Sequence, residues 1–178
     1  MRKLKNEELG RLSIKDFHAS RKVPLILLLD DVRSLHNVGS AFRTADAFRL
    51  DRLILCGITG KPPHREINKT ALGATESVTW EYFKDPMPVL ISYKEDGYRI
   101  IVIEQADESI SLMDFQLDQD RKYVLIFGNE ISGVNENIIA LADHVVEIPQ
   151  FGTKHSLNIS VSIGIVVWDL VSKLNLIS

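Results

Sequence analysis

The chain has 178 residues, of which 45% are hydrophobic and 25% charged, with a net charge of −3. This length suffices for one domain with a full hydrophobic core, and no apolar run is long and uncharged enough to span a bilayer. The single cysteine, Cys56, excludes an internal disulfide and predicts a cytoplasmic location. No cluster of Cys and His has the spacing of metal ligands, so we expect no metal.

The average charge hides a basic amino-terminal half. Residues 1–24 and 33–69 each contain seven Lys or Arg and three acidic residues, whereas residues 104–120 contain six acidic residues and no basic one. A local basic face is typical of proteins that contact phosphate groups. Charge-asymmetric domains without such a partner are nearly as common, so the charge alone leaves both interpretations open.

Residues 1–22 predict a short amphipathic helix or arm, followed by one domain over residues 23–178. No linker rich in Gly, Pro or Ser marks a second domain. Four apolar side chains are candidates to anchor the arm: Leu4, Leu9, Leu12 and Phe17.

Short apolar runs rich in β-branched residues recur along the rest of the chain. They lie at 23–30, 51–58, 98–104, 123–128 and 144–149. Near-continuous apolar runs are typical of parallel strands that are buried on both faces. Helical patterns separate them, at 37–48, 85–96, 134–142 and from 156 to about 174. The alternation predicts an α/β fold with helices covering a parallel sheet.

The first helical pattern, NVGSAFRTADAF, carries one apolar stripe. The stripe consists of Val38, Ala41, Phe42, Ala45 and Phe48. Asn37 is a favoured N-cap residue. Gly39 and Arg43 lie on the opposite side, and a glycine in a first turn suggests a close approach to the backbone. Arg43 is therefore either a ligand clamp or a solvated side chain paired with Asp46.

The last segment, SLNISVSIGIVVW, alternates like a strand, but residues 156–174 are too long for one without a breaker. We therefore predict a buried helix. Its small residues Ser156, Ser160 and Gly164 form a stripe that we expect to pack close to another backbone.

Three loops that follow predicted strands have unusual contents, and ligands of α/β sheets bind at the carboxyl ends of strands. The stretches are LDDVRSLHNVGSAFRTADAF, FGNEISG and IPQFGTKHSLN. Taken singly, Glu130 in the second loop reads as a turn carboxylate and Asn158 in the third as a helix-start residue. The usual glycine-rich fingerprints of dinucleotide and nucleotide phosphate sites are absent, which disfavours a nucleotide-binding module of that kind.

Taken together, three motifs in this order resemble a known family. They are N-x-G-x-x-x-R-T-A-D-A-F, F-G-N-E-x-x-G and I-P-x-x-G-x-x-x-S-L-N-x-S-V-S, and they resemble the SpoU (TrmH-like) branch of the SPOUT RNA methyltransferases. The resemblance extends from about Pro24 nearly to the end of the chain. It includes PPHREINKTALGA (62–74), which looks like the loop after the second strand in that family.

The resemblance implies a fold and an activity. The fold is a sheet whose carboxyl-terminal part is tucked through a loop in a deep trefoil knot, a rare exception to unknotted topology. The implied cofactor is S-adenosylmethionine, the implied assembly is a homodimer, and the implied reaction is methylation of a ribose 2′-hydroxyl in tRNA or rRNA. A catalytically inactive knotted RNA-binding or ribosome-assembly factor is the alternative.

The resemblance also assigns residues. Gly128, Ile148 and Leu157 match cofactor-binding backbone positions, and the third loop adds Gly152 and Ser156. Arg43 matches the arginine that acts on the ribose, with Asn37 close by, and Glu130 and Asn158 complete the catalytic set. Basic residues expected to guide RNA are Arg33, Arg49, Arg52, Lys61, Arg65 and Lys69. Gln150 departs from the methionine expected there.

Overall fold

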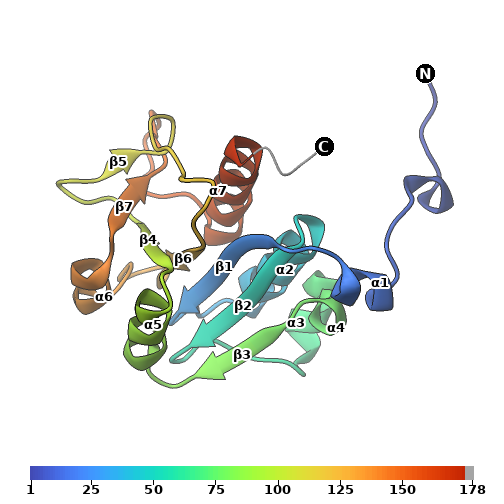
Figure 1. Cartoon of the computed structure of the whole chain (residues 1–178), viewed down its shortest axis with the longest axis horizontal. Coiled ribbons are helices and arrows are strands. Elements are labelled where there is room, and N and C mark those ends of the chain that lie inside the picture. Colours follow the sequence, from blue (N-terminus) through green and yellow to red (C-terminus); the bar gives the residue numbers. More distant parts are fainter. Residues whose placement is uncertain (175–178) are drawn as a thin grey trace.

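The computed structural model describes residues 1–174 and contains a seven-stranded sheet in the order β3-β2-β1-β6-β4-β7-β5 (Figure 1). All six neighbouring pairs run parallel. The strands are β1 (Val23–Asp30), β2 (Leu50–Cys56), β3 (Trp80–Phe83), β4 (Arg99–Ile103), β5 (Ile110–Ser111), β6 (Tyr123–Phe127) and β7 (His144–Glu147).

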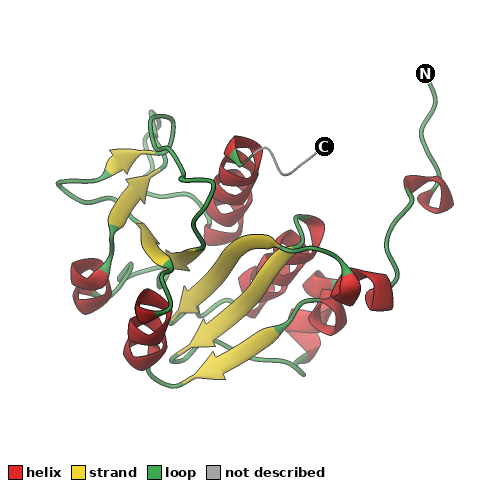
Figure 2. Ribbon diagram, in the orientation of Figure 1, coloured by secondary structure: helices red, strands yellow, loops and turns green. Residues whose placement is uncertain are grey.

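Helices connect most of the strands, except β4 to β5 and β5 to β6, and cover both faces of the sheet (Figure 2). A 3₁₀ turn, η1 (Asn6–Leu9), precedes them. The α-helices are α1 (Ile14–Ala19), α2 (Leu35–Ala47), α3 (Arg65–Ala71), α4 (Ala74–Ser77), α5 (Pro86–Glu95), α6 (Glu136–Leu141) and α7 (Ile159–Lys173). Within residues 1–174, no helix is long and apolar enough to cross a membrane.

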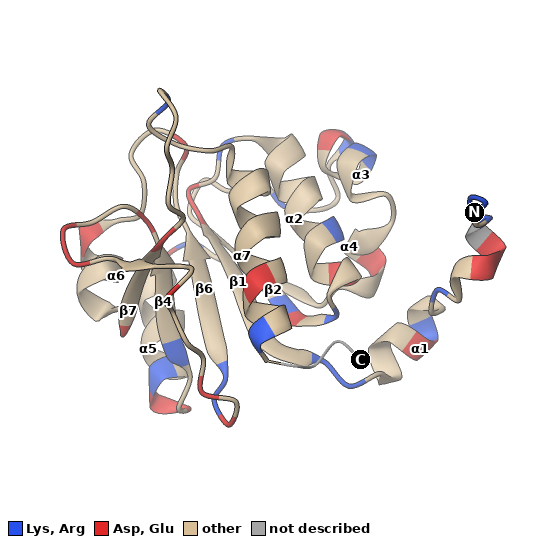
Figure 3. Ribbon diagram, turned by 90° about the horizontal axis from the view of Figure 1, so that it is seen from above, with Lys and Arg blue, Asp and Glu red and all other residues tan. Residues whose placement is uncertain are grey.

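Alternate side chains of β1, an inner strand of the sheet, point to two separate cores. Leu27 of β1 joins a cluster with Phe42 of α2 and Ile163 of α7, whereas its neighbour Leu28 joins a cluster with Leu90 of α5. Figure 3 shows the resulting layers, with α2 and α7 on one side of the sheet and α5 and α6 on the other. Burial on both faces explains why these strands read as continuous apolar runs.

The five predicted strands are present, which confirms the α/β sheet. Both edge strands, β3 and β5, were missed, because an edge strand is paired on one side only and does not need a continuous apolar run. The segment 62–74, expected to be a loop, contains α3 and the start of α4. The trefoil knot itself stays a prediction of the family resemblance.

The helix α2 begins earlier than predicted. Ser34 is its N-cap, and the Ser34 hydroxyl accepts the Asn37 N–H at 3.3 Å, so the prediction of Asn37 as the cap is wrong. Gly39 does mark a close approach, but the approaching element is α3: a Cβ at position 39 would collide with the Thr70 side chain and the Ile67 carbonyl. The glycine therefore serves helix packing.

The last segment is a helix, as predicted, although it begins at Ile159 instead of Ser156, with Asn158 as its N-cap. The expected close packing of its small-residue stripe is not found within the described chain, since a Cβ on Gly164 would meet nothing within 4 Å. The predicted domain continues to residue 178, and residues 175–178 lie outside the described part.

The amino-terminal arm contains η1 and α1 and extends away from the sheet (Figure 1). Of the four predicted anchors only Phe17 is buried; Leu4, Leu9 and Leu12 are exposed, so that part of the prediction is wrong. Phe17 lies in the core cluster that also contains residues of α2 and α4.

Candidate active site

A cavity of about 540 Å³ opens at the carboxyl ends of β4, β6 and β7. Four of the residues predicted to bind a cofactor line it: Gly128, Ile148, Ser156 and Leu157. Glu130 and Asn158, predicted as catalytic, also line it. Gly152 is exposed in the same loop and is not among the lining residues. The second and third motifs, which begin at Phe127 and Ile148, thus share one cavity.

The loop after β6 has little freedom to vary. A Cβ on Gly128 would collide with the backbone of Gly133 and Val134, because the loop closes on itself there. Backbone hydrogen bonds of 3.0 Å join Asn129 and Gly133 in both directions. The Asn129 amide also donates to the Asp31 carbonyl at 2.7 Å, which ties this loop to the end of β1. The loop is therefore held in one shape before any ligand arrives.

The Glu130 carboxylate connects this loop to the start of α2. It accepts the backbone N–H groups of Arg33 and Ser34 at 3.0 and 3.1 Å, and the Asn37 side-chain amide at 3.2 Å. Partial burial alone would raise the pKa of the Glu130 carboxyl, but these donated hydrogen bonds outweigh it and hold the pKa below its ordinary value. Glu130 is therefore ionised at neutral pH, with both oxygens occupied.

Asn37 extends the network to the last helix. Its side chain is buried, and its carbonyl oxygen accepts the Asn158 amide at 3.3 Å. The side-chain oxygen Oδ1 of Asn158 in turn accepts the backbone N–H and the hydroxyl of Ser160, at 2.9 and 2.6 Å. One polar chain thus joins residues of all three motifs, Asn37, Glu130 and Asn158.

Arg43 lies apart from this constellation. It follows Asn37 by six residues, which in an α-helix is roughly 9 Å along the axis and about 240° around it. Arg43 is exposed and lines a different cleft of about 700 Å³, formed by the arm, α2 and α4. The expectation that Arg43 and Asn37 lie close together is wrong for a single chain. The alternative pairing with Asp46 is not found among the described residues, where Asp46 accepts the Ser77 hydroxyl at 2.5 Å.

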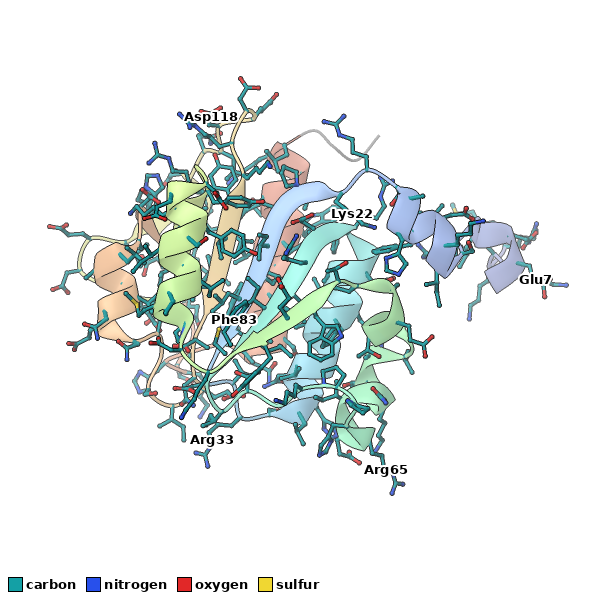
Figure 4. The ribbon with its side chains drawn as sticks, turned by 60° about the horizontal axis from the view of Figure 1, so that its bottom comes forward. Glu7, Lys22, Arg33, Arg65, Phe83 and Asp118 are labelled. Carbon is teal, nitrogen blue, oxygen red and sulfur yellow. The ribbon has the colours of Figure 1, made fainter. Side chains whose placement is uncertain are left out.

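The residues predicted to guide RNA are found at two ends of the sheet. Arg33 and Lys61 follow the carboxyl ends of β1 and β2, and Figure 4 shows Arg33 and Arg65 extending into solvent. Lys61 lies over the Tyr82 ring at 4.0 Å, and Lys69 is 3.9 Å from the Glu66 carboxylate.

Two arginines of the predicted set differ from the others. Arg49 lies at the opposite end, where its carbonyl accepts the first N–H of β1 at 2.8 Å. Arg52 is engaged by carboxylates, at 2.9 Å from Glu81 and 3.2 Å from Asp51. Arg52 is therefore a weaker candidate for contact with phosphate.

Sequence reasoning missed the contribution of β4 to the cavity. Glu104 and Gln105, directly after β4, line it together with Glu147 at the end of β7. The Glu104 carboxylate accepts the N–H groups of Gln105 and Val134 at 2.9 and 3.1 Å. Glu104 directly follows an apolar run, so the rule that strand ends carry ligand sites would have identified it. The sheet order, which inserts β4 between β6 and β7, is not visible in the sequence.

Residues 24–168 match the family model described as the SpoU rRNA Methylase family. The chain belongs to this family. Its relatives include a tRNA (guanosine(18)-2′-O)-methyltransferase from Aquifex aeolicus, 30% identical over 157 residues, which span 88% of this chain and 72% of that protein. Another is the 23S rRNA (guanosine-2′-O-)-methyltransferase RlmB from Neisseria meningitidis, 34% identical over 144 residues, or 81% and 56% of the two chains.

Solved structures of SpoU family proteins have the same fold. The A. aeolicus TrmH/SpoU tRNA modifying enzyme superposes with a TM-score of 0.80 at 28% identity, covering 91% of this chain and 82% of that one. An AdoMet-bound rRNA methyltransferase from Sinorhizobium meliloti superposes with a TM-score of 0.79 at 25% identity, covering 89% and 59%. These superpositions confirm the predicted parallel α/β fold of this family.

Proposed function

We propose that this chain transfers a methyl group from S-adenosylmethionine to a ribose 2′-hydroxyl of tRNA or rRNA. The chain is an RNA ribose 2′-O-methyltransferase of the SpoU family. The observation that carries the proposal is the cavity at the strand ends, bordered by the hydrogen-bonded network of Asn37, Glu130 and Asn158. The relatives are named for tRNA and for 23S rRNA, so the RNA is proposed only at this level.

S-adenosylmethionine is the cofactor, and the cavity fits it. Its volume lies within the range of small-molecule sites. Gly128 lines it without a side chain, and Glu104 and Glu147 give it an acidic lining that favours a cationic ligand. We propose that Gly128, Ile148, Ser156 and Leu157 hold the cofactor, with Gly152 in the loop that encloses it. When bound, the cofactor supplies a methyl group on positively charged sulfur.

The carboxylate of Glu130 is better suited to positioning than to proton transfer. Its oxygens accept three hydrogen bonds, and its pKa is held below the ordinary value. It orients Asn37, which orients Asn158 at the cavity wall. We therefore propose that Glu130 fixes the relative position of the loop after β6 and the start of α2.

Arg43 is proposed to act on the ribose, with its guanidinium binding the neighbouring phosphate and stabilising the developing oxyanion. Guanidinium is a poor base because it stays protonated, so the phosphate takes the proton or Arg43 is unusually deprotonated. Since Arg43 is outside the cavity of its own chain, we propose that it reaches the cavity of a second copy.

A homodimer through α2 and α7 is the assembly that would allow this. Three apolar side chains on one face of α7 are exposed, namely Val161, Ile165 and Trp168, and open space surrounds Gly164. The Trp168 ring packs against Phe48 beyond the end of α2, with ring centroids 6.0 Å apart. An apolar helix face of this kind needs a partner surface to cover it.

RNA is proposed to contact two basic regions. Arg33, Lys61, Arg65 and Lys69 follow strands β1 and β2, and Arg49 lines the cleft of Arg43 together with Arg11 of the arm. We propose that residues 1–22 form an RNA-contacting arm on a methyltransferase domain of residues 23–178. The single buried cysteine is compatible with the cytoplasmic location that we also propose.

The test is incubation with labelled S-adenosylmethionine and unfractionated cellular RNA, followed by mapping of the labelled nucleotide. The proposal predicts label on a ribose 2′-oxygen. Label on a base would contradict the proposed reaction. Binding of cofactor and RNA without any transfer would instead support the catalytically inactive assembly factor.

A further inference from the structure

The two most exposed large apolar side chains within residues 2–174 both lie beside the cavity. Phe151, in the loop after β7, is 95% exposed, and Ile131, in the loop after β6, is 79% exposed. Burying such side chains is normally favourable, and single exposed ones need no explanation. Here the two belong to the two loops that enclose the same site.

Their positions in these loops can be stated from their neighbours. Ile131 lines the cavity itself, and so do Gln150 and His155, on either side of Phe151 in the chain. The Gln105 side chain donates to the His155 carbonyl at 3.0 Å, which attaches this loop to the end of β4. Ile131 is therefore part of the cavity lining, and Phe151 lies in a loop whose flanking residues Gln150 and His155 line the same cavity.

Neither side chain supports the fold of its loop. The loop after β6 closes through backbone and Asn129 contacts, including the Ile131 N–H donated to the Asn129 side chain at 2.9 Å. Both side chains are absent from the two core clusters of the described residues. Nothing within 4 Å would meet a Cβ on Gly152, beside Phe151. The side chains are thus available to a ligand.

We propose that Phe151 and Ile131 hold the base of the nucleotide whose ribose is methylated, with the Phe151 ring stacked on it. This inference rests on the proposed function. The ribose has to approach the cavity from its mouth, where the attached base meets these two side chains. Proteins that bind single-stranded RNA stack its bases on aromatic rings, and stacking tolerates any base. Phe151 and Ile131, which we call the base clamp, would therefore position the nucleotide without selecting which base it carries.

The activity test compares Phe151→Ala with Phe151→Tyr, under single turnover with saturating cofactor and increasing unfractionated RNA. Loss of one stacking contact corresponds to a loss of about 5- to 150-fold in RNA affinity. We expect Phe151→Ala to raise the half-saturating RNA concentration by such a factor, and Phe151→Tyr to stay near the parent. Cofactor affinity, measured by calorimetry, should change by less than about twofold in both.

Met113→Ala is the matched control, because Met113 is 73% exposed and does not line the cavity. It should behave like the parent. A half-saturating RNA concentration for Phe151→Ala within twofold of the parent would overturn the clamp. The clamp would also be overturned if Phe151→Ala weakened the dimer in sedimentation but left the response to RNA unchanged. That result would place a second copy of the chain over Phe151.

A binding readout separates this inference from the proposed function. Phe151→Trp should show fluorescence quenching by single-stranded adenosine oligonucleotides, beyond that of the parent, whose tryptophans are Trp80 and Trp168. Met113→Trp should show no added quenching. If no RNA accepts a methyl group, the proposed function fails, but quenching specific to position 151 would still support the clamp. Equal quenching in both tryptophan variants would contradict it.

Discussion

The two halves of the proposed reaction centre differ in how complete they are within one chain. The cofactor half is assembled entirely from one copy: its cavity is enclosed by three strand-end loops and fixed by the network of Glu130, Asn37 and Asn158. The ribose half is represented by Arg43, which is exposed in a separate cleft on another face of α2. A single chain therefore contains the proposed cofactor cavity but does not place Arg43 in its lining.

This difference assigns separate tasks to the two faces of α2. The face with Asn37 supports the cavity of its own chain, whereas the face with Arg43 is exposed in a separate cleft and is the one proposed to contact RNA and a second copy. Mutations on the two faces should accordingly separate cofactor binding from methyl transfer.

The largest effect is expected from Arg43→Ala. Loss of one preorganised charge-stabilising donor typically reduces the rate on the order of a hundred- to a thousand-fold. Arg43→Lys should recover little, since an ammonium cannot replace a bidentate fork. Single-turnover assays measure the rate, and calorimetry should find cofactor affinity unchanged. Turnover of Arg43→Ala within about a factor of three of the parent would return Arg43 to the role of a solvated surface residue.

A similar loss of methyl transfer is expected from Ile165→Asp. Its carboxylate would lie in the exposed apolar face of α7, where burial against a partner would leave the charge unpaired. Sedimentation should find monomers at micromolar concentration, while cofactor affinity is retained. Ser172→Asp, at an exposed polar position of the same helix, is the control for added charge. Full activity of a monomeric Ile165→Asp variant would contradict the division of the site between copies.

The smallest effect is expected at Asp30. Its carboxyl group lies at the carboxyl-terminal end of β1, the same end of the parallel strands as the cavity, but does not line the cavity. Asp30, at the end of β1, is only 5% exposed, and burial together with the charges of Asp31 and Asp85 raises its pKa from 3.8 to about 6. The native state then binds this proton more tightly than the unfolded state, so the free energy of unfolding falls as pH rises from about 4 to about 6.

Asp30→Asn removes this titration and should stabilise the protein above pH 6. The gain is at most about 3 kcal/mol, from the difference between the two pKa values. Urea unfolding of parent and variant at pH 4 and pH 7.5 measures it. Cofactor affinity should not change. A variant that is less stable than the parent at pH 7.5 would show that the ionised carboxylate is stabilised by its surroundings.

The sequence predicts much of the cofactor half because its signals are local. Buried parallel strands such as β1 and β6 are continuous apolar runs, and Gly128 and Asn158 follow or precede regular elements. Single residues gave no decision between a turn carboxylate and a catalytic one at Glu130. Only the order of the three motifs predicted that Glu130 belongs to one site with Asn37 and Asn158, and hydrogen bonds join these residues over gaps of 93 and 121 residues.

Other features depended on packing that the sequence does not state. The close approach to Gly39 comes from α3, within a segment expected to be a loop. Ser34, and not Asn37, caps the helix, and the Asn37 side chain is engaged by Glu130. The separation of Arg43 from Asn37, in contrast, could have been predicted from the helical repeat of about 3.6 residues per turn, since a spacing of six residues places two side chains on different faces of a helix.

The most direct test of the divided site is complementation between two inactive variants. One is Arg43→Ala, and the other is Gly128→Ala, whose added Cβ collides with the loop backbone and should abolish cofactor binding in calorimetry. Mixed dimers are purified through a different tag on each subunit. If Arg43 acts on the cavity of its partner, one of the two sites in each mixed dimer has both an intact cavity and an arginine. The mixed dimer then shows about half the rate of the dimer without substitutions. If Arg43 acts within its own chain, both sites carry a defect. A mixed dimer as inactive as Arg43→Ala and Gly128→Ala alone would therefore contradict the division of the site between two copies.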